Sequence, residues 1–274
     1  MPLSSRRHEG ALPFVDHLRQ ESARFRAVLA EADPALRVPT CPDWRVDDLL
    51  WHLGEVQWFW GEIAQRRATS DSDVERLEAA KHPRPVDRSG LLDLFDHSSE
   101  RLARVLAATP PETELWMWAE DHSAAYIARR QAHEALIHRI DAELTVGAER
   151  APVDCRLAAD GVDEALRVMR GYEPEPGLSA TPTGPPVTIA LVDGFHTWTV
   201  TPARVTGTDS DGDTWDVQRL LGQDESASGS AAVSGRAADL DCWLWNRPAV
   251  GEISRTGDPA ALQALEAVVA GSID

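Results

Sequence analysis

The feature that most constrains the fold is the stretch from Ser123 to Val146, which contains neither glycine nor proline. Most of its residues are good helix formers, so it predicts one long helix that ends at Gly147. Glu134 and His138 are four residues apart in this stretch, and they therefore stack on the same side of the helix. A carboxylate and an imidazole placed in this way can hold one metal ion together.

A third ligand has to come from another segment, and His52 is the best candidate. It lies on the apolar face of a second predicted helix, residues 46–66, and is expected to point inward. An inward-facing histidine is more often a hydrogen-bonded core residue than a metal ligand. His133 is a rival ligand because it faces the apolar stripe more directly than His138, but it is expected to be a hydrogen-bonded core histidine. The residues alone leave two interpretations open, a metal site and an amphipathic helix with polar residues at its border.

The first half of the chain predicts a four-helix bundle. Amphipathic helices are expected at residues 12–31, 46–66, 88–108 and 123–146. Bundles of this kind form metal sites from Glu and His side chains that project inward from facing helices. This architecture would bring His52 to Glu134 and His138. The polar segment 69–87 is expected to be a surface loop, and the Pro-rich segment 38–44 is expected to be a rigid connection. The helix at 46–66 is expected to have Asp43 as its cap.

The second half of the chain has a different periodicity. Ala151-Pro152 marks the expected boundary, which gives domains at residues 1–150 and 151–274. Helices are predicted at 155–170, 237–245 and 259–269, and strands at 187–194, 196–200, 203–206, 231–235 and around 253. The segment 172–186 is rich in Pro, Gly and Thr and is expected to be a linker or loop. The predicted fold class is α+β, a helical bundle followed by a smaller α+β domain.

Composition excludes several classes of function. The 274 residues carry a formal net charge of -18, which argues against nucleic acid as a partner and against binding to an anionic membrane. No apolar run is long enough to cross a membrane. Three widely spaced cysteines without a CxxC pair, and a start without an apolar segment, indicate a cytoplasmic protein without a disulfide framework. The expected partners are small molecules, with the protein as a monomer or homodimer.

The candidate ligands suit particular metals. Two His and one Glu are a typical set for catalytic Zn²⁺, where three protein ligands leave a fourth position for water or substrate. Fe²⁺, Mn²⁺ and Ni²⁺ also bind such sets, because these ligands do not choose strongly among divalent ions. The sequence has no glycine-rich phosphate loop, no Gly-x-Ser-x-Gly and no cysteine in a nucleophile motif. The metal site is therefore the strongest candidate for chemistry.

Three segments have distinctive patterns: Cys41-Pro42-Asp43-Trp44 with Asp48-Leu49-Leu50-Trp51-His52-Leu53-Gly54, then His133-Glu134-Ala135-Leu136-Ile137-His138-Arg139, and Ala237-Ala238-Asp239-Leu240 with Trp243-Leu244-Trp245-Asn246-Arg247. They resemble motifs of the mycothiol-dependent maleylpyruvate isomerase family, whose N-terminal domain belongs to the DinB-like superfamily. The segments occur in order and span nearly the whole chain. The resemblance implies a DinB-like metal-binding bundle followed by a small C-terminal domain.

The resemblance also implies roles for single residues. It makes His52, Glu134 and His138 the metal ligands, and it makes Arg247 the C-terminal arginine that helps to bind an anionic substrate over the metal. The alternative for Arg247 is a surface or helix-capping salt bridge. Asn246 stands where the family pattern is expected to have glycine, so the backbone beside Arg247 is a point of departure.

The function implied by the resemblance is that of a zinc-dependent enzyme with mycothiol, a thiol of actinobacteria, as cofactor or cosubstrate. Its thiolate would add to a cis double bond of an anionic substrate, the resulting single bond would rotate, and elimination would give the trans isomer. A mycothiol S-transferase that acts on electrophiles is the alternative. A non-catalytic metal- or thiol-binding module is the second alternative.

Overall fold

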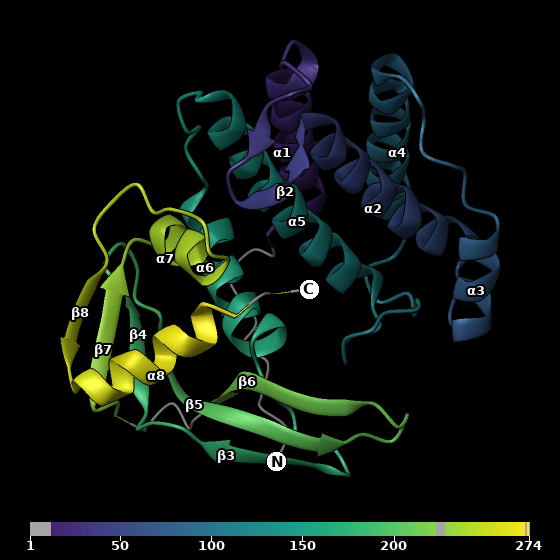
Figure 1. Cartoon of the computed structure of the whole chain (residues 1–274). Helices are drawn as coiled ribbons and strands as arrows, with labels where there is room; N and C mark the ends of the chain where they lie inside the picture. Colours follow the sequence, from purple (N-terminus) through teal and green to yellow (C-terminus); the bar gives the residue numbers. More distant parts are fainter. Residues whose placement is uncertain (1–11, 223–227, 272, 274) are drawn as a thin grey trace. The chain divides into compact units, whose positions relative to one another are not determined.

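The computed structural model describes residues 12–222, 228–271 and 273. The chain divides into two compact units, Met1–Ala151 and Pro152–Asp274. The first is built from helices and one short hairpin, and the second from a mixed sheet with helices (Figure 1). The predicted fold class, a helical bundle followed by a smaller α+β part, is confirmed.

Four long helices dominate the first unit. In chain order its elements are α1 (Phe14–Ala30), β1 (Arg37–Val38), β2 (Cys41–Arg45), α2 (Val46–Arg66), α3 (Asp71–Ala79), α4 (Arg88–Ala108) and α5 (Ala124–Val146). The helices α1, α2, α4 and α5 are the four predicted from periodicity. They pack mainly in two pairs, α1 against α5 and α2 against α4. Ser123 caps α5 by accepting a hydrogen bond from the Tyr126 amide, and Gly147 ends the helix in the left-handed conformation at φ 67°.

One apolar core joins α1, α2, α4 and α5. Its buried members are Phe25, Leu29, Val38, Val46, Leu49, Leu50, Leu53, Leu91, Phe95 and Ala142. The rings of Phe25 and Phe95 lie 5.1 Å apart between α1 and α4. Gly54 of α2 faces the backbone of α4 at Phe95, where an added Cβ would lie 3.5 Å from Cα of Phe95. This packing sets the position of α2, and with it the position of His52.

Helix α5 is buried on nearly all sides, which differs from the expected apolar stripe with a polar border. His138 is 7% exposed, and Asp141 and Glu143 are fully buried. The charged residues of α5 are accommodated by ion pairs, since Arg139 donates to Glu21 of α1 and to Glu143 of its own helix. A helix at the centre of a bundle keeps such residues only when their charges are paired.

Three local expectations about the connections were wrong. Segment 69–87 is not a continuous loop, because α3 forms within it. Ser70 caps α3 by accepting from the Asp73 amide, and only Leu77 is buried, so its sequence carries little periodicity. The segment expected to be a rigid connection forms the β1–β2 hairpin. The cap of α2 is Arg45 instead of Asp43, and the Arg45 amide donates to the carboxylate of Asp48.

The second unit contains one six-stranded sheet. Its elements are α6 (Cys155–Glu164), the π-helix η1 (Ala165–Met169), β3 (Leu178–Pro182), β4 (Val187–Leu191), β5 (Thr197–Thr208), β6 (Thr214–Gly222), β7 (Ala231–Gly235), α7 (Ala237–Leu244), β8 (Ser254–Gly257) and α8 (Pro259–Val269). The strand order is β3-β5-β4-β7-β8, and β6 pairs with β5. Only β4 and β7 are parallel among the pairs of described strands. Helix α8 packs against this sheet (Figure 1).

The structure corrects several predictions for this unit. Strand β3 forms inside the expected loop 172–186, because it adds to the edge of β5. Strand β5 continues through Pro202, which was expected to interrupt it, and strand β6 was not predicted. The predicted start of the last helix is confirmed, since Asp258 caps α8 by accepting from the Ala260 amide at 2.8 Å. In the described parts of the chain, no helix has both the length and the apolar character that a membrane crossing requires.

Candidate metal centre

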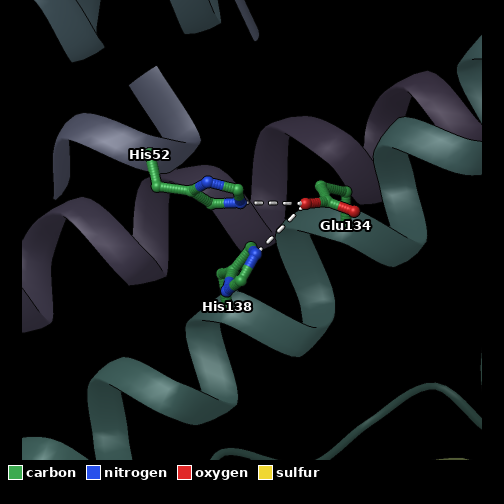
Figure 2. Close-up of side chains that lie close together, drawn as sticks. All are labelled: His52, Glu134 and His138. Carbon is green, nitrogen blue, oxygen red and sulfur yellow. Dashed lines mark hydrogen bonds and ion pairs between the residues drawn. The ribbon is translucent and has the colours of Figure 1, made fainter. Parts of the chain in front are cut away.

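Three side chains from two helices converge in the first unit. His52 comes from α2, and Glu134 and His138 come from successive turns of α5 (Figure 2). Oε1 of Glu134 lies 3.1 Å from Nε2 of His138 and 3.4 Å from Nε2 of His52. One potential ligand atom from each residue lies within 4.8 Å of the other two. The structure therefore brings together the three residues that the sequence singled out.

This donor set fits a divalent ion such as Zn²⁺. Metal–ligand distances of about 2.0 to 2.2 Å in a tetrahedral site place neighbouring ligand atoms roughly 3.3 to 3.6 Å apart. The two measured separations from Oε1 of Glu134, 3.1 and 3.4 Å, are close to that range. Two imidazoles and one carboxylate also have the mixed nitrogen and oxygen chemistry that borderline metals prefer.

The carboxylate of Glu134 is held by an arginine of its own helix. Nη2 of Arg130 donates to Oε2 of Glu134 at 2.6 Å, and Arg130 is 4% exposed. Burial alone would raise the pKa of Glu134, but the charge of Arg130 and the hydrogen bonds from His138 and His52 outweigh burial and hold it well below its usual range. Glu134 is therefore ionised, and its two oxygens are divided between Arg130 and the histidines.

His138 lies between two carboxylates. Its Nε2 faces Glu134, and its Nδ1 lies 3.0 Å from Oδ2 of Asp141, one turn further along α5. Burial alone would lower the pKa of His138, but the hydrogen bonds and negative charges of Asp141 and Glu134 outweigh burial and raise it to about 9. A metal ion would have to displace the proton on Nε2 to bind there.

The β1–β2 hairpin places the ring of Trp44 beside the two imidazoles. The ring of Trp44 lies 4.7 Å from the ring of His52 and 6.3 Å from that of His138. The hydroxyl of Thr40, in the turn of the hairpin, donates to Oδ1 of Asp141 at 2.6 Å. The segment that the sequence predicted as a rigid connection is therefore part of the surroundings of the site.

A cavity of about 280 Å³ opens beside His52. It is lined by His52, Glu55, Val56, Phe59, Trp60 and Glu78. The lining combines aromatic and aliphatic surface with two carboxylates, and Lys81 forms an ion pair with Glu55 at its edge. A ligand with one atom at the three converging side chains would have space for its remaining atoms here.

His133 is placed in the core and not in this site. It is 1% exposed, and its ring meets that of Phe14 edge-on at a centroid distance of 6.2 Å. It is not among the residues that could share a metal ion with His52. The expectation that His133 is a core residue and His138 the better candidate agrees with this geometry.

Arg247 belongs to the second unit and follows α7. Its Nη1 donates to the main-chain oxygen of Trp245 at 2.6 Å, and its amide donates to the oxygen of Cys242 at 2.7 Å. The preceding residue, Asn246, has φ 59°, a left-handed conformation that favours glycine and that asparagine tolerates. This explains why glycine was expected at that position.

Sequence reasoning assigned no role in the site to four residues that shape it, namely Arg130, Asp141, Thr40 and Trp44. Two of them could have been found by spacing. Arg130 precedes Glu134 by four residues and Asp141 follows His138 by three, so both share the ligand face of α5. Thr40 and Trp44 act across the tertiary structure, where residue spacing gives no signal.

Comparisons with known proteins point in one direction. Residues 15–143 match the sequence family described as the mycothiol maleylpyruvate isomerase N-terminal domain. Two crystal structures, of the mycothiol-dependent maleylpyruvate isomerase and of a mutant of it, each match with a TM-score of 0.55 at 14% sequence identity. The match covers 93% of this chain and 97% of that chain. At this level of identity the likeness establishes a shared fold. A search of curated protein sequences finds no significant match.

Proposed function

Because this chain belongs, through its N-terminal unit, to the mycothiol maleylpyruvate isomerase family, we propose that it is a metal-dependent enzyme that uses mycothiol as a cofactor or cosubstrate. The family predicted from the three sequence motifs is thus confirmed. The proposed reaction is the cis–trans isomerisation of an unsaturated anionic substrate of the maleylpyruvate type. The observation that carries the proposal is the convergence of His52, Glu134 and His138 beside an open cavity.

The three side chains would hold the metal, and the metal would supply one piece of chemistry. A divalent ion such as Zn²⁺ acts as a Lewis acid that keeps a bound thiol ionised near neutral pH. When bound there, mycothiol would supply a thiolate for reversible addition to the conjugated double bond of the substrate, which would give the trans isomer without net consumption of thiol.

The residues of this chain would provide binding and charge. Glu134 is kept ionised by Arg130, so its second oxygen is available as an anionic metal ligand. The cavity beside His52 offers apolar and carboxylate surface for the atoms of the thiol that do not react. Arg247 would bind a carboxylate of the substrate, because a guanidinium can donate two parallel hydrogen bonds to it.

The first test is the metal content of the native protein and of His52→Ala and His138→Ala, measured by elemental mass spectrometry. His133→Gln is the matched control, since it alters a buried histidine of α5 that lies outside the site. We expect about one zinc per chain in the native protein and the control, and loss of zinc from both alanine variants with unchanged circular dichroism. A native protein that contains no metal and cannot be loaded with zinc would refute the proposal.

The second test separates isomerase from S-transferase. Zinc-loaded protein is incubated with mycothiol and a cis-configured unsaturated dicarboxylate, and both the free thiol and the isomer ratio are followed. An isomerase converts many equivalents of substrate without net loss of thiol, whereas a transferase consumes one thiol per product. If a zinc-containing protein neither converts the substrate nor consumes thiol, the result would favour the non-catalytic binding module. In the isomerase, Arg247→Met should raise KM for the anionic substrate far more than Arg247→Lys does.

A further inference from the structure

A short chain of hydrogen bonds leads from the β1–β2 hairpin to the imidazole of His138. The hydroxyl of Thr40 donates to Oδ1 of Asp141 at 2.6 Å, and Oδ2 of Asp141 lies 3.0 Å from Nδ1 of His138. Asp141 is completely buried and His138 is 7% exposed. The contacts are therefore shielded from water, which would otherwise compete for the same hydrogen bonds.

This arrangement determines where His138 keeps a hydrogen once a metal ion binds. Both ring nitrogens face a carboxylate, Nε2 toward Oε1 of Glu134 at 3.1 Å and Nδ1 toward Oδ2 of Asp141 at 3.0 Å. An ionised carboxylate can only accept, so when a metal ion takes the lone pair of Nε2, the remaining hydrogen is on Nδ1 and is donated to Asp141. The orientation of the ring is set at the same time, because the hydrogen bond restricts rotation about its side-chain torsions.

Thr40 restricts the orientation of the Asp141 carboxylate in the same way, through a hydrogen bond. The carboxylate has two oxygens, and one is held by the hydroxyl while the other is held by the ring of His138. Thr40 lies in the turn between β1 and β2, and it reaches α5 from a distant part of the sequence. The geometry thus connects the hairpin to one imidazole by hydrogen bonds, and the same hairpin contacts the other imidazole through Trp44.

We propose that Asp141 and Thr40 are positioning residues of the metal centre, with Asp141 fixing the tautomer and orientation of His138 and Thr40 fixing Asp141. The inference rests on the proposed function, because it requires that His138 binds a metal ion through Nε2. A hydrogen-bond partner that holds a ligating imidazole in place strengthens metal binding without touching the metal.

The test measures zinc affinity by competition with a chromogenic chelator at fixed pH. Asp141→Asn keeps the shape of the side chain and removes its charge, and Thr40→Val removes only the hydroxyl. The matched control is Thr145→Val, because Thr145 has a buried hydroxyl on the same helix that donates to the main-chain oxygen of Asp141 instead of its carboxylate. Circular dichroism and thermal unfolding of each variant show whether the fold is kept.

We expect Asp141→Asn to weaken zinc binding by about 10- to 100-fold, the range typical of such partners. Thr40→Val should weaken it less but in the same direction, and Thr145→Val should leave it unchanged. In the double variant, Thr40→Val should have little further effect, because its action passes through the carboxylate that is already gone. The nitrogen-15 NMR signal of the protonated Nδ1 of His138 should be visible in zinc-loaded native protein and lost in Asp141→Asn.

The outcomes separate this inference from the proposed function. If the native protein binds zinc and Asp141→Asn binds it equally well, the positioning role is refuted while the proposed function stands. If Asp141→Asn does not fold, the zinc affinity of Thr40→Val is the deciding measurement. A zinc affinity of Thr40→Val equal to that of Thr145→Val overturns the inference. If the native protein binds no zinc, the proposed function fails first and the inference fails with it.

Discussion

Replacing Arg139 by methionine should strongly destabilise the first unit, and the structure allows the loss of stability to be worked out. Arg139 is 1% exposed in the middle of α5. Its Nε donates to Glu21 of α1 at 2.8 Å, and its Nη1 donates to Glu143 at 2.8 Å. These contacts tie α1 to α5, the helix that supplies Glu134 and His138. Methionine keeps much of the length and apolar volume of the side chain, so the change removes mainly charge and hydrogen bonds.

The expected cost follows from the partners that remain. Breaking a buried ion pair costs about 3 to 5 kcal/mol, because the remaining charge stays buried without compensation. Glu143 would keep hydrogen bonds from Nε of Arg24 at 2.9 Å and from the Ala151 amide at 3.2 Å. The loss of stability therefore comes mainly from the buried charge of Glu21. We expect Arg139→Met to lower the free energy of unfolding by about 3 kcal/mol, the lower end of that range. Adding Glu21→Gln should recover part of the stability, since it removes the charge left behind.

The assay is urea unfolding of the full chain followed by far-UV circular dichroism. For a slope of about 1 to 3 kcal/mol per molar urea, the midpoint should fall by roughly 1 to 3 M. The matched control is Arg24→Met, which removes a second arginine from Glu143 but one whose side chain is 44% exposed, so it should cost less than about 1 kcal/mol. A cost below about 1 kcal/mol for Arg139→Met, or an equal cost for the control, would refute the reasoning.

Three further predictions concern other parts of the chain. A methyl group on Gly54 would lie 3.5 Å from Cα of Phe95, an ordinary contact, so Gly54→Ala should raise the free energy of unfolding by up to about 1 kcal/mol through helix propensity, as measured by urea unfolding. His138 has a pKa of about 9 in the metal-free protein, and its proton has to leave before Nε2 can coordinate; zinc affinity from chelator competition should therefore rise about tenfold per pH unit up to 9. Asn246 has φ 59°, so Asn246→Ala should lower stability by about 1 to 2 kcal/mol in thermal unfolding, whereas Asn246→Gly should have little effect.

Features that depend on local spacing could be predicted from the amino-acid sequence. Helix α5 was evident from a stretch without glycine or proline, and its two ligand candidates followed from residues four apart on one helix. The start of α8 followed from Asp258-Pro259, a capping residue and a proline at the first helical position. The motif resemblance named the family whose N-terminal domain matches residues 15–143. In each case the relevant physics acts within one or two turns of the chain.

Tertiary structure alone decided what lies around those local features. The spacing of Glu134 and His138 says nothing about His52, whose approach depends on the packing of α2 against α4 and α5. Edge strands such as β3 form because a neighbouring strand offers unpaired hydrogen-bonding groups, so their own sequence need not alternate. The contacts of Thr40 with Asp141 and of Trp44 with His52 join the hairpin to the helices. Such contacts depend on how whole elements pack in three dimensions. The periodicity of a single segment does not indicate which distant segments will pack against it.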